Sequence, residues 1–311
     1  MTPAILALAA LLVTPPARLD RAATLERAAQ AVAEGRRAEA ERLYRDAATR
    51  FRSVRAMVEL ARLQMADGRT ADALATLSRA RLRAPHAEDV LSAYAQVALA
   101  ARAPVPAAEV LVPLTRMCPT VAAYHYRLGV ALLQAGDVTG AVESLQRAQA
   151  IEPDRPLTLV ALGLALVSAK RHAEAKPLLL RSLDLEPDGV EALAALAEAE
   201  EGLGELDAAE DHASRALARD PGHATANLAL GMVRMKQDRY ADARAPLERA
   251  ARAAAEQPKA HYQLSLAYAR LGEDALSERH RALYAARLSE VEARMKALRA
   301  ATGEAPEEAA R

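Results

Sequence analysis

The sequence predicts an all-α fold, a solenoid of stacked antiparallel helix pairs. Three series of residues predict it, because each series recurs at intervals of 34 residues. The series are Pro85, Pro119, Pro153, Pro187 and Pro221; Ala73, Ala107, Ala141, Ala175, Ala209 and Ala243; and Leu128, Leu162, Leu196, Leu230 and Leu264. One interval shared by three residue types indicates a single supersecondary unit that is repeated along the chain.

Each unit is predicted to be a pair of helices. Around Gly136, apolar residues recur on both sides at spacings of three and four, which is the period of a helix. Gly136 fits the end of the first helix, and Pro153, which lacks a backbone N–H group, ends the second. Short side chains at Gly129 and Ala141 are expected where the two helices cross. Neighbouring units repeat this choice with Gly163 and Ala175, Ala197 and Ala209, and Gly231 and Ala243.

A helix pair with Leu128, Gly129, Ala141, Leu145 and Pro153 at these spacings resembles the tetratricopeptide repeat. The resemblance covers about residues 21–280, although the family's leading Trp is absent and its aromatic pair is mostly Leu or Ala. It implies a right-handed superhelix whose first helices line a concave surface. Seven repeats are expected to start near Arg21, Val54, Glu88, Ala122, Pro156, Val190 and Ala224, with a partial eighth near Pro258.

Residues 1–17 differ from the repeats. Ala4 to Val13 form an apolar run of ten residues, and Pro15, Pro16 and Ala17 follow it. This length suits the core of a signal peptide and is too short to span a bilayer. We therefore expect a cleaved signal peptide over 1–17 and a periplasmic or secreted mature chain without a membrane span. Because no Lys or Arg precedes the run, the alternative is a first solenoid helix in a cytoplasmic protein.

The repeats are expected to fill residues 18–272, and a long polar helix is expected over 273–301. Neither Gly nor Pro interrupts that second stretch. Because the ends of a solenoid need a polar cover, the helix is expected to cap the stack, with Leu276, Leu283, Tyr284 and Leu288 facing inward. Residues 302–311 are rich in Ala and Glu and are expected to be disordered.

Charge is balanced over the whole chain and uneven along it. The 41 basic and 41 acidic side chains cancel, so no overall basic field is available to attract nucleic acid. Residues 18–87 nevertheless carry 15 basic against 9 acidic side chains, and residues 190–223 carry 2 against 9. The acidic stretch is predicted to be either a solvated outer face or a patch that receives a basic partner. That patch would comprise Glu198, Glu200, Glu201 and Glu205.

No pattern of residues indicates an enzyme. The sequence lacks a Gly-rich phosphate loop, G-x-S-x-G, H-E-x-x-H and C-x-x-C. The seven histidines hold differing places in their repeats, so neither a metal nor a cofactor is predicted. Cys118, the single cysteine, is expected to be a small, partly buried side chain, and a disulfide to another molecule is the alternative.

The surface predicted to act is the concave face formed by the first helices. From the fourth repeat to the seventh, its free side is mostly apolar, and two glutamates interrupt it. The predicted groove residues are Tyr126, Val130, Leu133, Val160, Leu164, Val167, Glu198, Glu201, Leu228, Met232 and Met235. Such a floor suits an amphipathic helix or an apolar peptide, and flexible Met side chains favour adaptable binding. The alternative is that these residues pack between repeats.

The sequence thus predicts a non-enzymatic scaffold for protein–protein interaction in the bacterial cell envelope, with a peptide or helix bound in the concave groove. The alternative is an accessory subunit or adaptor of an export or maturation machinery, such as that of a polysaccharide, a pilus or a cytochrome. In both cases the partner is a protein or peptide, and no nucleic acid is expected.

Overall fold

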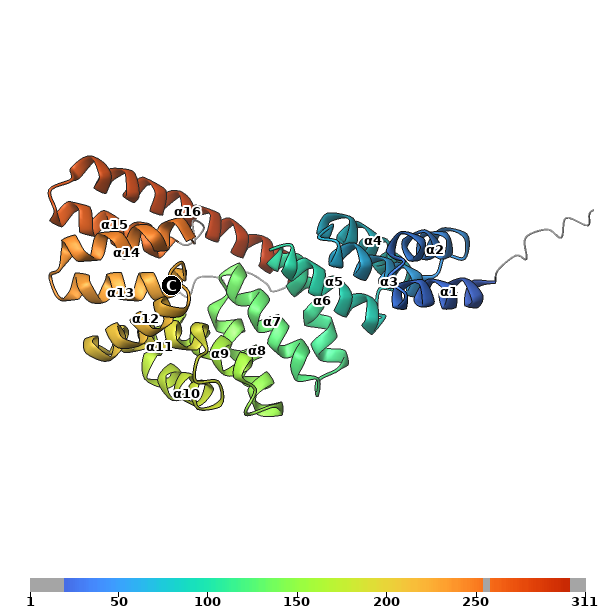
Figure 1. Cartoon of the computed structure of the whole chain (residues 1–311), viewed down its shortest axis with the longest axis horizontal. Helices are drawn as coiled ribbons and strands as arrows, with labels where there is room; N and C mark the ends of the chain where they lie inside the picture. The colour runs from blue at the N-terminus through green and yellow to red at the C-terminus, as the bar shows by residue number, and fades with distance from the viewer. Residues whose placement is uncertain (1–19, 254–257, 303–311) are drawn as a thin grey trace, which may run out of the picture. The chain divides into compact units, whose positions relative to one another are not determined.

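The structure, a computed structural model, describes residues 20–253 and 258–302, and every element in these ranges is an α-helix. The helices are α1 (Arg21–Ala33), α2 (Arg37–Arg50), α3 (Val54–Ala66), α4 (Thr70–Arg83), α5 (Glu88–Ala100), α6 (Pro104–Met117), α7 (Ala122–Ala135), α8 (Val138–Ile151), α9 (Pro156–Ser168), α10 (His172–Leu185), α11 (Val190–Leu203), α12 (Leu206–Arg219), α13 (Ala224–Lys236), α14 (Tyr240–Ala253), α15 (Pro258–Arg270) and α16 (Asp274–Thr302). The fold is therefore an all-α solenoid of helix pairs, as the sequence predicts (Figure 1).

The chain divides into two compact units, Met1–Ala93 and Tyr94–Arg311. The first unit holds α1–α4 and the start of α5, and the second holds the rest of α5 and α6–α16. From α6 to α16 each helix packs on the next, and α11 also contacts both α9 and α13 directly. The predicted groove residues all belong to this second unit.

The periodic prolines mark the ends of second helices. The helices α4, α6, α8, α10 and α12 each end two residues before a proline of the series. A residue before proline is disfavoured in the helical conformation, and the prediction that these prolines end the second helices is confirmed. From Val54 to Pro258, the first helices of successive pairs begin 34 residues apart.

Glycine allows the two helices of a pair to cross closely. A Cβ atom on Gly129 would overlap the side chain of Leu145 on α8. A Cβ atom on Gly163 would lie 2.6 Å from Leu179, and one on Gly231 would lie 2.5 Å from Leu247. The close crossings predicted at these three glycines are confirmed, because no larger residue fits between the helices.

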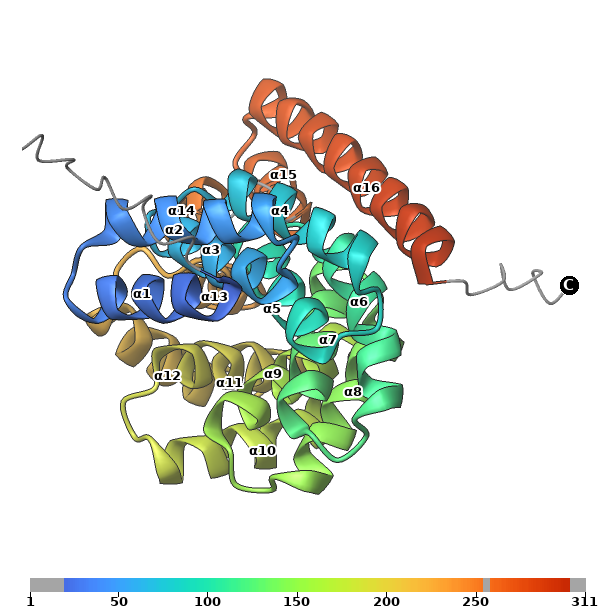
Figure 2. The ribbon, with the colours of Figure 1, turned by 90° about the vertical axis from the view of Figure 1, so that its right-hand side faces the viewer.

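The long helix α16 does more than cap the last pair. Its first part packs on α15, and its last part contacts α6 and α7 (Figures 1 and 2). Arg294 Nη1 donates a hydrogen bond of 3.0 Å to the backbone carbonyl of Gln134, and Leu298 is buried. Val291 and Met295 pack against Gly136, the left-handed residue that ends α7. The helix thus joins the two ends of the second unit.

Leu288 departs from the expected inward face of this helix, because it is 39% exposed. It lies between Tyr284, whose ring is 5.3 Å from the ring of Tyr262 on α15, and Val291, which contacts α7. The side chain therefore falls between the two surfaces on which α16 packs.

Two histidines join α15 to α16. Nδ1 of His261 lies 3.0 Å from Nδ1 of His280, so one ring donates a hydrogen bond and the other accepts it. Burial lowers the pKa of both histidines; Arg287 lowers that of His261 further, and His261 that of His280. Since a nitrogen that accepts a hydrogen bond cannot carry a proton, this contact requires at least one neutral ring.

The predicted signal peptide lies outside the described residues, and so do residues 303–311 of the predicted tail. Within 20–253 and 258–302, no helix combines the length and the apolar character needed to cross a bilayer.

Candidate peptide-binding groove

Five of the predicted groove residues line one apolar pocket. Tyr126, Val130 and Leu133 come from α7, and Val160 and Leu164 come from α9. All five side chains are half-buried, and the pocket has a volume of about 350 Å³. A concave site of this size accommodates a few apolar side chains of a ligand.

The edge of this pocket contains residues that the sequence analysis missed. Leu157, in the first turn of α9, lines the pocket and is 57% exposed. The carboxylates of Glu186 and Glu191 and the amide of Gln134 form a polar rim. The helical period would have assigned Leu157 to the same face as Val160 and Leu164.

An arginine holds the aromatic wall of the pocket. The guanidinium of Arg155 lies over the ring of Tyr126, 5.4 Å from its centroid, an arrangement that is attractive for a cation and an aromatic face. Burial raises the pKa of Tyr126, and the positive charge of Arg155 acts in the opposite direction. The phenol is therefore neutral near pH 7 and serves as an apolar wall with a polar edge.

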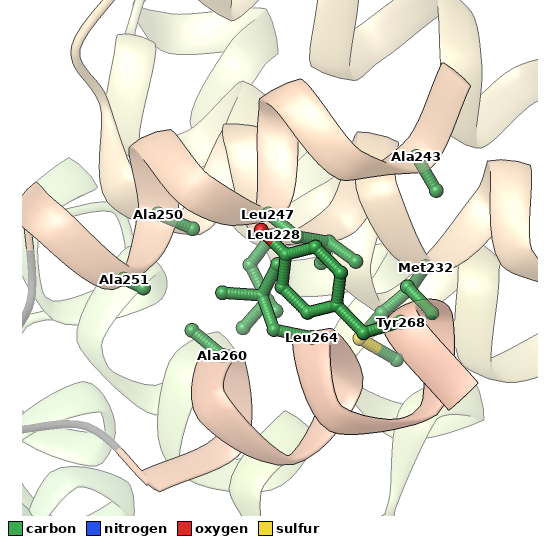
Figure 3. Packing of buried hydrophobic residues seen from close by; sticks show 10 residues of the cluster. Leu228, Met232, Ala243, Leu247, Ala250, Ala251, Ala260, Leu264 and Tyr268 are labelled. Carbon is green, nitrogen blue, oxygen red and sulfur yellow. The ribbon is translucent and has the colours of Figure 1, made fainter. Parts of the chain in front are cut away.

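The predicted floor does not extend to α13. Leu228 is buried and Met232 is 9% exposed, both in a cluster with Leu264 and Tyr268 of α15, and Met235 packs against that cluster. Figure 3 shows Leu228, Met232 and Leu264 gathered around the ring of Tyr268. Leu228, Met232 and Met235 therefore belong to the packing between repeats, which corrects the expectation of an open floor here.

Alanines on α11 explain why this part is closed. Ala194 and Ala197 have no exposed surface, and α11 contacts both α9 and α13. Short side chains allow helices to approach closely, so the residues that face α11 lose contact with solvent. Val167 near the end of α9 is buried, and it too is not an open floor residue.

The two glutamates of the predicted groove are paired within the chain. Glu201 is 3% exposed, and a carboxylate oxygen lies 2.8 Å from Nζ of Lys236. Lys236 also donates a hydrogen bond of 2.6 Å to the backbone carbonyl of Glu201. Glu198 pairs with Lys259 of α15. Lysines of the chain thus occupy the place that the alternative of a basic partner assigns to a ligand.

Glu200 and Glu205, the other two carboxylates of the predicted acidic patch, also have partners. The buried carboxylate of Glu200 lies 2.7 Å from Nδ1 of His212 and 3.6 Å from Nζ of Lys176. Lys176 also pairs with Glu205. The acidic patch is thus paired with side chains of the chain itself, and it contributes to packing between repeats.

A half-buried histidine, His172, also lies in this part of the molecule. The ring of His172 lies against Gly202, where a Cβ atom would come within 2.5 Å of the ring. Burial lowers the pKa of His172, and Lys170 lowers it further, while Glu198 and Glu201 act in the opposite direction. The imidazole is therefore neutral near pH 7.

Stacked helix pairs with an open apolar pocket between first helices define a helical repeat protein of the kind that mediates protein–protein interaction. Models of the tetratricopeptide repeat match residues 31–97, 95–156, 160–224 and 228–279. The chain belongs to the tetratricopeptide repeat family. The coarse function that follows is that of an interaction scaffold with protein partners.

Solved structures have a similar fold. A tetratricopeptide repeat protein from Parabacteroides merdae ATCC 43184 is 13% identical with a TM-score of 0.61, and the match covers 79% of this chain and 98% of that one. The Cut9 and Hcn1 hetero-tetramer of the APC/C is 18% identical with a TM-score of 0.58, and the match covers 81% of this chain and 49% of that chain. PilW, a type IV pilus biogenesis factor, is 17% identical with a TM-score of 0.51, and the match covers 67% of this chain and 96% of that chain.

At such identities the likeness is one of fold. No curated protein sequence matches the chain at a significant level.

Proposed function

We propose that the chain is a non-enzymatic scaffold that holds an apolar peptide, or the apolar face of a partner helix, in the pocket between α7 and α9. The observation that carries this proposal is the set of five half-buried apolar side chains around one pocket of about 350 Å³. These side chains stay partly exposed although every described neighbouring segment is in place. Apolar surface gathered in a concave site is typical of a binding surface.

The arrangement of these residues suits a helical or extended ligand. Tyr126, Val130 and Leu133 follow one side of α7 at spacings of four and three, and Val160 and Leu164 follow α9 at a spacing of four. The pocket therefore has two parallel apolar walls with a trough between them, the form in which a helix face binds in a groove. A ligand side chain that is fully buried there would contribute about 1–3 kcal/mol.

An aspartate in the apolar wall of the pocket tests this proposal. Leu164→Asp places a charge on the apolar wall, whereas Leu180→Asp places the same charge on an exposed site of α10 outside the pocket. Peptides selected from a random phage library on the full chain supply the ligands. The proposal expects Leu164→Asp to weaken a groove ligand roughly tenfold or more, and Leu180→Asp to leave its affinity unchanged. A library whose ligands all bind both variants equally would contradict it.

We also propose that the scaffold acts in the cell envelope, on the basis of the apolar run Ala4 to Val13. A mature N-terminus near Arg18, measured by mass spectrometry on protein from the native envelope fraction, would support this location. Recovery of the full-length chain from the cytoplasm would contradict it.

The second candidate is an adaptor of an export or maturation machinery, such as that of a pilus. Its support is the apolar run together with the likeness of fold to PilW, which extends to no residue role. A pull-down from envelope extract, with Leu164→Asp as the matched control, separates the candidates. Components of one assembly machinery that are lost with the variant would favour the adaptor.

A further inference from the structure

The first unit contains a second pocket, which the proposed groove does not use. It has a volume of about 710 Å³ and lies where α1 and α3 begin, beside Tyr44 of α2. Its basic lining residues are Arg21, Arg52 and Arg55, and Leu25 and Ala29 form an apolar side. Its volume is sufficient for several residues of a peptide.

The three arginines of this pocket have no partner within the described part of the chain. Arg21, Arg52 and Arg55 are exposed, and none of them forms an ion pair with a described carboxylate. By contrast, Arg36 and Arg69 of the same unit each pair with more than one carboxylate. Three guanidinium groups that share one pocket and form no ion pair attract a carboxylate ligand, which arginine binds through paired hydrogen bonds.

Helix stability does not explain the positions of two of these arginines. Arg21 is the first residue of α1 and Arg55 the second of α3, where the positive end of the helix dipole disfavours a cation. The arginines and the helix N-termini thus add positive potential at the same place. An anionic ligand would convert both unfavourable placements into favourable ones.

The rest of the lining indicates a peptide, because a polyanion such as nucleic acid would meet repulsion there. Two carboxylates, Glu26 and Glu59, also line the pocket, and Glu59 pairs with Arg62 at 2.8 Å. The side chain of Tyr44 is 5% exposed, and its hydroxyl has no hydrogen-bond partner within residues 20–253 and 258–302. A peptide offers carboxylates to the arginines, N–H groups to the glutamates and an aliphatic side chain to Leu25.

We propose that the first unit binds an acidic peptide segment in this pocket. Carboxylates of the ligand pair with Arg21, Arg52 and Arg55, the hydroxyl of Tyr44 donates a hydrogen bond to the ligand, and an aliphatic side chain of the ligand packs on Leu25. This site is separate in sequence and in chemistry from the apolar pocket of α7 and α9.

Selection from a random phage-displayed peptide library tests the site. The bait is the full chain carrying Leu164→Asp, which removes ligands of the other pocket. Counter-selection uses the same chain with Arg21→Ala and Arg55→Ala, and Arg79→Ala, an exposed arginine of α4 outside the pocket, is the matched control. Both pocket substitutions remove a cation from a helix N-terminus, so the melting temperature should stay the same or rise.

The expected ligands are rich in Asp and Glu with an aliphatic residue nearby. Their affinity, measured by fluorescence anisotropy, should fall roughly tenfold or more with Arg21→Ala and Arg55→Ala and fall as salt rises from about 50 to about 300 mM. Tyr44→Phe should weaken binding a few-fold, and Arg79→Ala should leave it unchanged.

Three results would overturn the proposal: ligands without acidic residues, ligands that the double arginine variant still binds, or displacement by inorganic phosphate at equal concentration, which would show a site for small anions. Each result leaves the test at Leu164 unaffected, so the two sites fail independently.

Discussion

The pair α7 and α9 and the pair α11 and α13 occupy equivalent places in successive repeats, yet only the first pair leaves an apolar pocket open. Tyr126, Val130, Val160 and Leu164 are half-buried there. At α13 the equivalent Leu228 and Met232 lie in the core of the last repeats. One repeated pattern thus produces a binding surface in one region and packing in another.

The difference lies in the side chains between neighbouring first helices. At Ala194, α11 carries a short, fully buried side chain where α7 has Tyr126 and α9 has Val160, and both α9 and α13 contact α11. On α13 the apolar side chains are covered by α15, since Leu228 and Met232 cluster with Leu264 and Tyr268. The concave face is therefore closed by alanine on α11 and by α15 beside α13, and it stays open beside Tyr126 and Leu164.

The largest effect should come from a charge at equivalent places in the two regions. Met232→Lys puts an ammonium group into a core cluster and should lower the free energy of unfolding by on the order of 3–5 kcal/mol. Leu164→Lys changes a half-buried wall and should cost about 1 kcal/mol. Urea denaturation followed by circular dichroism measures both. Equal losses would mean that the two regions do not differ.

Breaking an ion pair should separate the regions next. Lys236→Ala leaves the buried carboxylate of Glu201 without its cation and should cost about 2 kcal/mol, since an unpaired buried charge is unfavourable. The control Glu191→Ala changes an exposed carboxylate at the rim of the open pocket and should stay within about 0.5 kcal/mol. An unchanged free energy of unfolding for Lys236→Ala would contradict this account, since the carboxylate of Glu201 would then be exposed to solvent.

A smaller effect on the free energy of unfolding should test the contact between α16 and the end of α7. Gly136 and Gly204 both end a first helix with positive φ, so alanine should cost about 1 kcal/mol at either site. A Cβ atom on Gly136 would also lie 3.2 Å from Val291 and 3.3 Å from Met295, whereas one on Gly204 meets nothing within 4 Å. Gly136→Ala should therefore cost more, by about 1 kcal/mol.

Leu298→Asp, which detaches the end of α16, should remove this excess in a double-mutant cycle. An excess that persists in the double variant would show that α16 does not contact the end of α7.

The weakest expected effect is a dependence of stability on pH. It should arise from histidines in the closed region and at the contact between α15 and α16. The pKa values of His172, His261 and His280 are lowered from 6.5, mainly by burial. The unfolded chain therefore binds more protons than the folded chain just below pH 6.5, and stability should fall as pH decreases through this range. His280→Gln should reduce the slope in urea titrations at pH 7.5 and pH 5.5. An unchanged slope would exclude this residue as a source.

The fold could be predicted from the sequence, because the residues that form a helix, a turn or a helix end recur in each 34-residue unit. Each of them acts on neighbours only a few residues away. The closure of the concave face depends on contacts between residues that lie far apart in the sequence. Lys236 and Lys259 reach Glu201 and Glu198 from 35 and 61 residues away, and Arg294 reaches Gln134 across 160 residues. The helical period places Met232 and Leu164 on equivalent faces, but it does not contain the approach of a neighbouring helix that buries one and leaves the other accessible.

Cysteine reactivity tests the division of the concave face most directly. In a Cys118→Ser background, single cysteines at Val130, Leu164, Val167 and Leu228 would be labelled with a maleimide under native conditions. Cysteines at Val130 and Leu164 should react roughly tenfold or more faster than those at Val167 and Leu228, because the latter react only when the structure opens locally. Equal rates at Leu164 and Leu228 would contradict the account, since the concave face would then be uniformly open or uniformly closed.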